Sequence, residues 1–197
     1  MRELLHGTML GDGYLEPHGR GTRLQVVHSA AQKAYIEWKH RQLAELNPSP
    51  LYYYAKAKYP FWRFVTTAHP YLTELREKFY VANKRVVPDD ILELLKTPLA
   101  LAVWFMDDGT LSKHQGTVLF ETQSFSVEDI EKLQWCLQAN FGLQSKPHQS
   151  GKGRGLRLYI GVAEARKLKA IIEPYVLDQM RYKLPFVPVT TEAARPR

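Results

Sequence analysis

The chain has 197 residues, of which 45% are hydrophobic and 12% aromatic, so it can bury the core of one large domain or two small halves and is not a disordered tail. Lysine and arginine total 27 against 20 aspartate and glutamate, and the formal charge of +7 points to a polyanionic partner such as nucleic acid. Cys136 is the only cysteine, no apolar run reaches the roughly 18 residues of a membrane span, and no secretory signal opens the chain, which excludes disulfide frameworks, cysteine-based zinc sites and membrane partners. We therefore expect an intracellular protein, in a cytoplasm or an organelle matrix.

The first half of the chain predicts the order helix, two strands, helix, two strands, helix. Apolar residues spaced three and four apart indicate the helices, and short alternating runs indicate the strands. Pro60 separates the last two strands and Pro70 opens the last helix. The elements are expected at residues 5–12, 14–17, 22–27, 31–46, 51–59, 61–67 and 69–81.

The second half repeats this order. Its elements are expected at residues 98–107, 110–112, 117–122, 127–140, 143–148, 156–161 and 163–174. The repetition predicts an α/β protein of the α+β type with two pseudo-symmetric αββαββα halves. We expect the halves at residues 1–88 and 98–189, a linker at 89–97 and a flexible tail at 190–197.

Two runs, LHGTMLGDG at 5–13 and LAVWFMDDG at 101–109, share one design: an apolar helix that ends in an acidic residue followed by glycine. Asp12 and Asp108 are thereby placed at helix C-termini, where a carboxylate is disfavoured by up to ~1 kcal/mol, and glycine is the residue that best ends a helix. If the two runs pack together, the carboxylates meet and repel unless a cation lies between them. The pattern predicts a divalent metal site at Asp12 and Asp108.

Basic and tyrosine residues alternate with apolar residues along the predicted strands. Tyr52, Tyr54, Lys56 and Lys58 share one face, and the opposite face carries Tyr53 and two alanines. Such a face suits phosphates and base edges in the major groove, and the alternative is the solvated face of an antiparallel sheet. The predicted DNA-binding residues are Arg20, Arg23, Tyr52, Tyr54, Lys56, Lys58, Arg63, Lys113, Lys146, Lys152, Arg154, Arg157 and Tyr159.

Two further features are assigned by pattern. The stretch SGKGRG at 150–155 lies between two strands and lacks the spacing of a nucleotide-binding loop, so we expect a hairpin tip that grips backbone phosphates. Trp62, Trp104 and Trp135 are expected to anchor the core rather than to stack on bases.

From about residue 4 to 185 the sequence resembles the single-chain, two-motif branch of the LAGLIDADG homing endonucleases. The two runs ending in Asp12-Gly13 and Asp108-Gly109 carry this resemblance, together with LAVWFMDDGT, TQSFS, QMRYKLP and FYVANKRVVP. It implies that the two motif helices pack at the centre and that a four-stranded, saddle-shaped antiparallel sheet from each half lies in the DNA major groove. It also implies that Asp12 and Asp108, the final acidic residues of the motifs, bind Mg²⁺ or Mn²⁺.

The resemblance further implies a basic residue near each reaction centre, which polarises water or neutralises charge. Lys183 matches this position in the second half; in the first half the match is Lys84 or Arg85, and the spacing to Pro88 favours Arg85. Gln123 matches a polar residue at a strand end that orients water. His28 takes that place in the first half, and its alternative is a surface histidine.

By the same resemblance, small residues let the motif helices approach closely. Gly7 and Gly11 fill this role in the first motif, whereas Val103 and Asp107 stand at the matching positions of the second. We therefore expect asymmetric packing. Because Asp107 lies about 100° round the helix from Asp108, we expect it to support the site rather than to share the metal.

Together these features predict a monomeric endonuclease that binds a long asymmetric DNA target. It would make a Mg²⁺-dependent double-strand break with short 3′ overhangs, and its gene would lie in a mobile intron or intein-like element. The alternatives are a maturase, for which the partner is intron RNA, and a non-cleaving DNA-binding regulator on the same scaffold. Retention of both Asp12 and Asp108 disfavours the regulator, since a pure binder gains nothing from crowded carboxylates beside phosphates.

Overall fold

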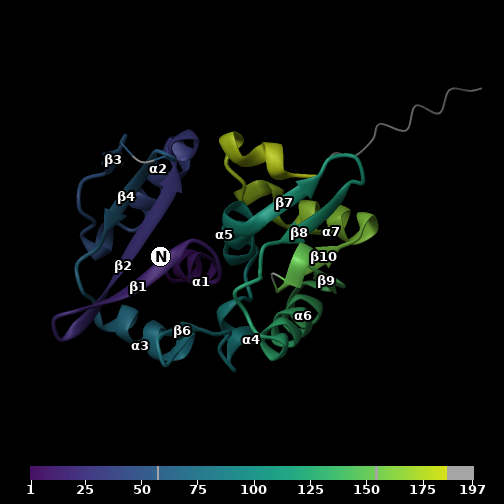
Figure 1. The fold of residues 1–197 in the computed structure, drawn as a ribbon, viewed down its shortest axis with the longest axis horizontal. Coiled ribbons are helices and arrows are strands. Elements are labelled where there is room, and N and C mark those ends of the chain that lie inside the picture. Colours follow the sequence, from purple (N-terminus) through teal and green to yellow (C-terminus); the bar gives the residue numbers. More distant parts are fainter. Residues whose placement is uncertain (57, 154, 186–197) are drawn as a thin grey trace, which may run out of the picture.

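The computed structural model describes residues 1–56, 58–153 and 155–185 and contains two halves of the same topology (Figure 1). Each half holds a four-stranded antiparallel sheet, ordered β1-β2-β4-β3 in the first and β7-β8-β10-β9 in the second. The two orders are equivalent, since the second and fourth strands of each half form the middle of its sheet. The predicted fold class is confirmed.

The elements of the first half follow the expected order. They are α1 (Arg2–Leu10), β1 (Gly13–His18), β2 (Gly21–Ser29), α2 (Lys33–Gln42), β3 (Tyr52–Tyr54), β4 (Phe61–Val65) and α3 (Pro70–Phe79). Short 3-10 turns at η1 (Ala30–Gln32) and η2 (Ala44–Leu46) flank α2.

The second half repeats them. Its elements are α5 (Pro98–Asp108), β7 (Gly109–Ser112), β8 (Thr117–Phe120), α6 (Val127–Phe141), β9 (Lys146–Gln149), η3 (Gly151–Gly153), β10 (Leu156–Ile160), α7 (Val162–Ile172), η4 (Glu173–Tyr175) and η5 (Asp178–Lys183). Among the described residues, no helix is both long and apolar enough to span a bilayer.

Helices α1 and α5 lie side by side at the centre of the molecule, between the two sheets (Figure 1). Their close approach depends on the glycines of α1, because a Cβ on Gly7 would lie 2.3 Å from the carbonyl oxygen of Ala100. A Cβ on Gly11 would lie 2.4 Å from the Cβ of Asp107. The expected asymmetry of packing is therefore present: the first motif carries glycines at the contact, and α5 places larger side chains against them.

Two elements of the first half are shorter than predicted. The helix expected over 31–46 ends at Gln42, and a 3-10 turn over Ala44–Leu46 takes up the rest of the range before Asn47, at a left-handed φ of 46°. The strand expected over 51–59 spans only Tyr52–Tyr54, because β4 begins at Phe61 and the chain must first turn back. Lys56 and Lys58 are consequently exposed in this turn and not on a strand face, as had been predicted.

The connection between the halves contains structure that the sequence patterns missed. Strands β5 (Tyr80–Val81) and β6 (Lys84–Arg85) form a small hairpin, and α4 (Ile91–Leu94) follows in the predicted linker. Ala82 and Asn83 close the hairpin with φ of 48° and 63°, the left-handed conformations of a two-residue turn. The hairpin shortens the helix expected over 69–81, which ends at Phe79, and it directs Arg85 toward α1.

The three tryptophans do not share one environment. Trp104 is fully buried and Trp62 packs partly buried against the core, as predicted. The expectation for Trp135 was wrong, because 58% of this residue is exposed. The buried face of α6 carries Ile130, Leu133 and Leu137, and Trp135 projects from another side of the helix.

Candidate active site

The two motif runs end at the α1–α5 interface. Helix α1 ends at Leu10, so Asp12 lies between the helix and β1, whereas Asp108 is the last residue of α5. Gly13 and Gly109 allow neighbouring atoms to pack closely, and they do not end their helices in a left-handed conformation. A Cβ on Gly13 would lie 2.7 Å from Thr8, and Gly109, at a φ of −69°, would place a Cβ 2.4 Å from the Phe105 ring.

Asp12 lies close enough to Asp108 to influence its ionisation. Burial and the negative charges of Asp107 and Asp12 raise the pKa of Asp108 to about 8. Burial also acts to raise the pKa of Asp12, but its hydrogen bond to His28 and the positive charges around it lower that pKa below the ordinary value. Asp12, whose side chain is 41% exposed, is therefore ionised at neutral pH. The neighbouring Asp108 retains its proton to near neutral pH.

Asp107 forms a buried ion pair that joins the two halves. Lys39 Nζ lies 2.7 and 2.8 Å from the two carboxylate oxygens of Asp107, and neither side chain has any exposed surface. The hydroxyl of Tyr35 donates a third bond of 2.7 Å to the same carboxylate. Lys39 and Tyr35, the partners of Asp107, were missed by the sequence analysis.

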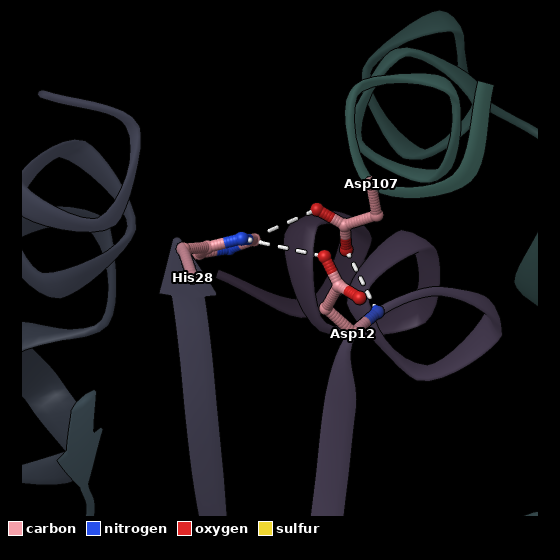
Figure 2. A group of neighbouring side chains, drawn as sticks. All are labelled: Asp12, His28 and Asp107. Atoms are coloured by element: carbon pink, nitrogen blue, oxygen red, sulfur yellow. Dashed lines mark hydrogen bonds and ion pairs between the residues drawn. The ribbon is translucent and has the colours of Figure 1, made fainter. Parts of the chain in front are cut away.

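His28 faces Asp12 and Asp107, which lie next to each other (Figure 2). Its Nδ1 is 3.3 Å from Asp12 Oδ2 and its Nε2 is 3.9 Å from Asp107 Oδ1. One donor atom from each of these residues lies within 4.8 Å of the others, a spacing that could hold a metal ion. The side chain of His28 is fully buried at the end of β2, so the alternative of a surface histidine is wrong.

A basic residue covers the C-terminal end of each motif helix. Arg85 donates hydrogen bonds of 2.6 and 2.5 Å to the carbonyl oxygens of Gly11 and Gly13. Lys183 Nζ donates bonds of 2.6 and 3.0 Å to the carbonyl oxygens of Met106 and Asp107. Both cations neutralise the partial negative charge of a helix end.

The choice between Lys84 and Arg85 is decided by geometry. Lys84 is exposed and pairs with Val81 in the small hairpin, so the structure brings Arg85, and not Lys84, to the end of α1. Burial lowers the pKa of Lys183, although Asp107, Asp12 and Asp108 counteract this effect. Arginine, in contrast, stays protonated in proteins.

Gln123 follows β8, and its side chain is hydrogen-bonded to a charged residue. Its Nε2 donates a 2.5 Å bond to Glu121, whose carboxylate is also paired with Arg157 at 2.9 Å. Gly155, at a φ of 89°, packs on the backbone of Gln123, and a Cβ there would lie 2.4 Å from the Gln123 carbonyl oxygen. The segment predicted as a hairpin tip over 150–155 therefore packs, through Gly155, against the residue that follows β8.

Residues predicted to contact DNA lie on the sheet faces opposite the core and on neighbouring turns. In the first half Tyr52 pairs opposite Arg63, and the rings of Tyr52 and Tyr54 are 6.2 Å apart on this face. Tyr53, on the other face, packs against Trp62. The other described members are Arg20, Lys56, Lys58 and Lys113 in turns, Arg23 in an ion pair with Glu16, and Lys146, Arg157 and Tyr159 on β9 and β10. Arg154, the side chain of Lys152 and the predicted tail at 190–197 lie outside the described residues.

Comparisons with known proteins agree with this architecture. The model of the LAGLIDADG DNA endonuclease family matches residues 2–168. The homing endonuclease I-WcaI, solved bound to its DNA recognition sequence, superposes with a TM-score of 0.82 at 28% identity, over 94% of this chain and 86% of that one.

Curated relatives cover nearly the same span. Probable intron-encoded endonuclease 1 of Wickerhamomyces canadensis is 30% identical, over 93% of this chain and 83% of its own length. The cytochrome b mRNA maturase bI2 of Debaryomyces hansenii is 28% identical, over 93% of this chain and 73% of its own. The chain spans less than half the length of the RecA relatives that it matches. Family match, fold and paired motif ends lead to one conclusion: this chain belongs to the LAGLIDADG DNA endonuclease family and carries two motifs in one chain.

Proposed function

We propose that the protein acts as a monomer that binds a long asymmetric DNA target and cuts both strands with a divalent cation, leaving short 3′ overhangs. The observation that carries this proposal is the packing of α1 against α5, which brings the two motif ends together so that the negative charge of Asp12 helps to raise the pKa of Asp108. One chain supplies both motif ends, so a second copy is not needed to complete the site. The halves differ in sequence, and the target therefore need not be a palindrome.

The residues at this site fit Mg²⁺ or Mn²⁺. Carboxylate oxygens are the ligands that these ions prefer, and Asp12 and Asp108 would supply two such groups, of which Asp12 helps to raise the pKa of Asp108. The pKa of Asp108 is raised first by burial and then by the charges of Asp107 and Asp12, which the positive charges of Arg85 and Lys183 offset only in part. A bound divalent cation would stabilise the charge that develops on the phosphate and activate a water molecule.

The remaining residues would orient the attacking water and neutralise negative charge at the two centres. Arg85 and Lys183, held on the helix-end carbonyls, would stabilise negative charge at the two centres. Gln123, fixed by Glu121, would accept a hydrogen bond from the attacking water. Arg85 is a poor proton acceptor, whereas a lysine of lowered pKa such as Lys183 can exchange a proton, so the two centres differ chemically.

The two sheets would form the DNA-binding surface. Arg63 and Tyr52 in the first half, and Arg157 and Tyr159 in the second, lie on the open faces of paired strands. A two-stranded ribbon fits the major groove, where arginine reads guanine and tyrosine contacts sugar and phosphate. These contacts would position the scissile phosphates over Asp12 and Asp108.

The decisive experiment is selection of cleavable sites from a randomised duplex library in Mg²⁺, followed by mapping of both cut ends. We expect recovery of a long, non-palindromic consensus with 3′ overhangs. A folded protein that cleaves no member of the library would refute the proposed activity. Recovered blunt ends or 5′ overhangs would refute the proposed cutting geometry.

A maturase activity is a second candidate, because the similar proteins of Debaryomyces hansenii and Saccharomyces cerevisiae are both named cytochrome b mRNA maturases. Affinities for the selected DNA duplex and for a structured intron RNA, measured at the same salt concentration, discriminate the two activities. Preferential RNA binding would favour the maturase, since both ligands carry the same phosphate charge.

The pH dependence of stability tests the site without DNA. The unfolded chain loses the Asp108 proton near pH 4, while the folded protein retains it to about pH 8. The folded state therefore binds more protons in this interval, and stability falls as pH rises, by at most about 1.4 kcal/mol per pH unit. We expect the melting temperature of the wild type to fall between pH 5 and 8 relative to Asp108→Asn.

Magnesium should reverse this loss, because the cation takes the place of the proton. We expect a larger Mg²⁺-induced rise in melting temperature at pH 8 than at pH 6 for the wild type, and little rise for Asp108→Asn. The lowered pKa of Asp12 affects stability only in more acidic solution and does not interfere. Parallel melting profiles of the two proteins would contradict the assignment.

A further inference from the structure

The ion pair between Lys39 and Asp107 is part of a buried hydrogen-bond network. It connects α2 of the first half to α5 of the second, with both side chains fully buried and both carboxylate oxygens engaged. Tyr35 adds a hydrogen bond to the same carboxylate. A buried pair with this number of charge-assisted bonds has a fixed geometry.

This arrangement has no counterpart in the other half. Gly11 stands in the first motif where Asp107 stands in the second, immediately before the final acidic residue. The buried residues of α6, the helix equivalent to α2, include no lysine. The network therefore contributes to the asymmetry of the site rather than to its pseudo-symmetry.

The network holds Asp12 at two points. Asp107 Oδ2 accepts a hydrogen bond of 3.2 Å from the backbone N–H of Asp12. His28, buried against the ring of Tyr35 at 4.7 Å between centroids, contacts the Asp12 carboxylate (Figure 2). Across the described residues, the side chain of Asp108 takes part in no hydrogen bond or ion pair, whereas the Asp12 carboxylate lies 3.3 Å from His28 Nδ1 and the Asp12 backbone is bonded to Asp107.

We propose that Lys39 and Asp107 are positioning residues that preorganise Asp12 and make its centre the faster of the two, so that one DNA strand is cut before the other. This inference rests on the proposed function. A carboxylate that is already held in place needs no reorganisation when the cation and phosphate bind, whereas Asp108 must be ordered by them. The product that accumulates first would be a nicked duplex.

The test is single-turnover cleavage of a selected target whose two strands carry different labels, with enzyme in excess and Mg²⁺ present. The informative variant is Lys39→Met combined with Asp107→Asn, because it leaves no unpaired charge in the interior. We expect the faster strand of the wild type to be slowed by about 10–100-fold, the usual effect of removing a group that supports a metal ligand. The slower strand should change by less than about twofold.

Leu72→Ala is the matched control, because this residue is fully buried in α3 and belongs to neither the network nor the metal site. General destabilisation reduces the active fraction and slows both strands by the same factor. A double variant that also slows both strands equally, or that leaves their rate ratio unchanged, would overturn the inference. Equal strand rates in the wild type would overturn it as well.

The outcome separates this inference from the proposed function. If the wild type cuts no duplex, the proposed function fails. If the wild type cuts both strands and the double variant preserves their ratio, only the positioning role of Lys39 and Asp107 fails.

Discussion

Replacing either Asp12 or Asp108 with asparagine should abolish double-strand cleavage and leave DNA binding in Ca²⁺ largely intact. Each substitution removes a carboxylate that could bind the cation but retains the shape of the side chain. Calcium also binds carboxylate oxygens, but its flexible coordination differs from the octahedral geometry of magnesium. Gel-shift affinity in Ca²⁺ and cleavage of a labelled duplex in Mg²⁺ provide the two measurements.

Asp89→Asn is a suitable control for this experiment. The side chain of Asp89 is 95% exposed and pairs with Lys132 at the surface, away from the motif helices. We expect wild-type cleavage from this variant, since it makes the same change of charge outside the site. Full cleavage by Asp12→Asn or Asp108→Asn would remove the basis of the metal assignment.

The second large effect concerns stability. Lys39→Met alone should lower the free energy of unfolding by about 3–5 kcal/mol, because it leaves the Asp107 carboxylate buried without a countercharge. Adding Asp107→Asn should restore most of this loss, since the interior then contains no unpaired ion. Urea denaturation at pH 7, analysed as a double-mutant cycle, measures both quantities.

Lys132→Met offers the comparison at the surface. Its ion pair with Asp89 is solvent-exposed, and we expect no measurable change in stability from its loss. If Lys39→Met changed the free energy of unfolding as little as Lys132→Met does, the Lys39–Asp107 pair would not be buried in solution as it is in the structure.

The sequence by itself determined the repeated order of helices and strands, because local periodicity is visible without knowing what each element packs against. It also located the two motif ends, since Asp12-Gly13 and Asp108-Gly109 are contiguous signals. The close approach at Gly7 and Gly11 was expected as well. Where local patterns failed, at the end of α2, at β3 and at Trp135, burial and chain reversal decided the outcome instead.

Only the tertiary structure decided how the site is supported. Lys39 falls on the apolar face of its helix, four residues after Tyr35, and this was the one local sign that a lysine is buried. Its partner Asp107 lies 68 residues away, and Arg85 reaches Gly11 over a separation of 74. Contacts of this range depend on how helices cross and on how hairpins turn. Residue spacing could favour Arg85 over Lys84, but it could not show that Arg85 binds the Gly11 carbonyl oxygen or that Lys39 pairs with Asp107.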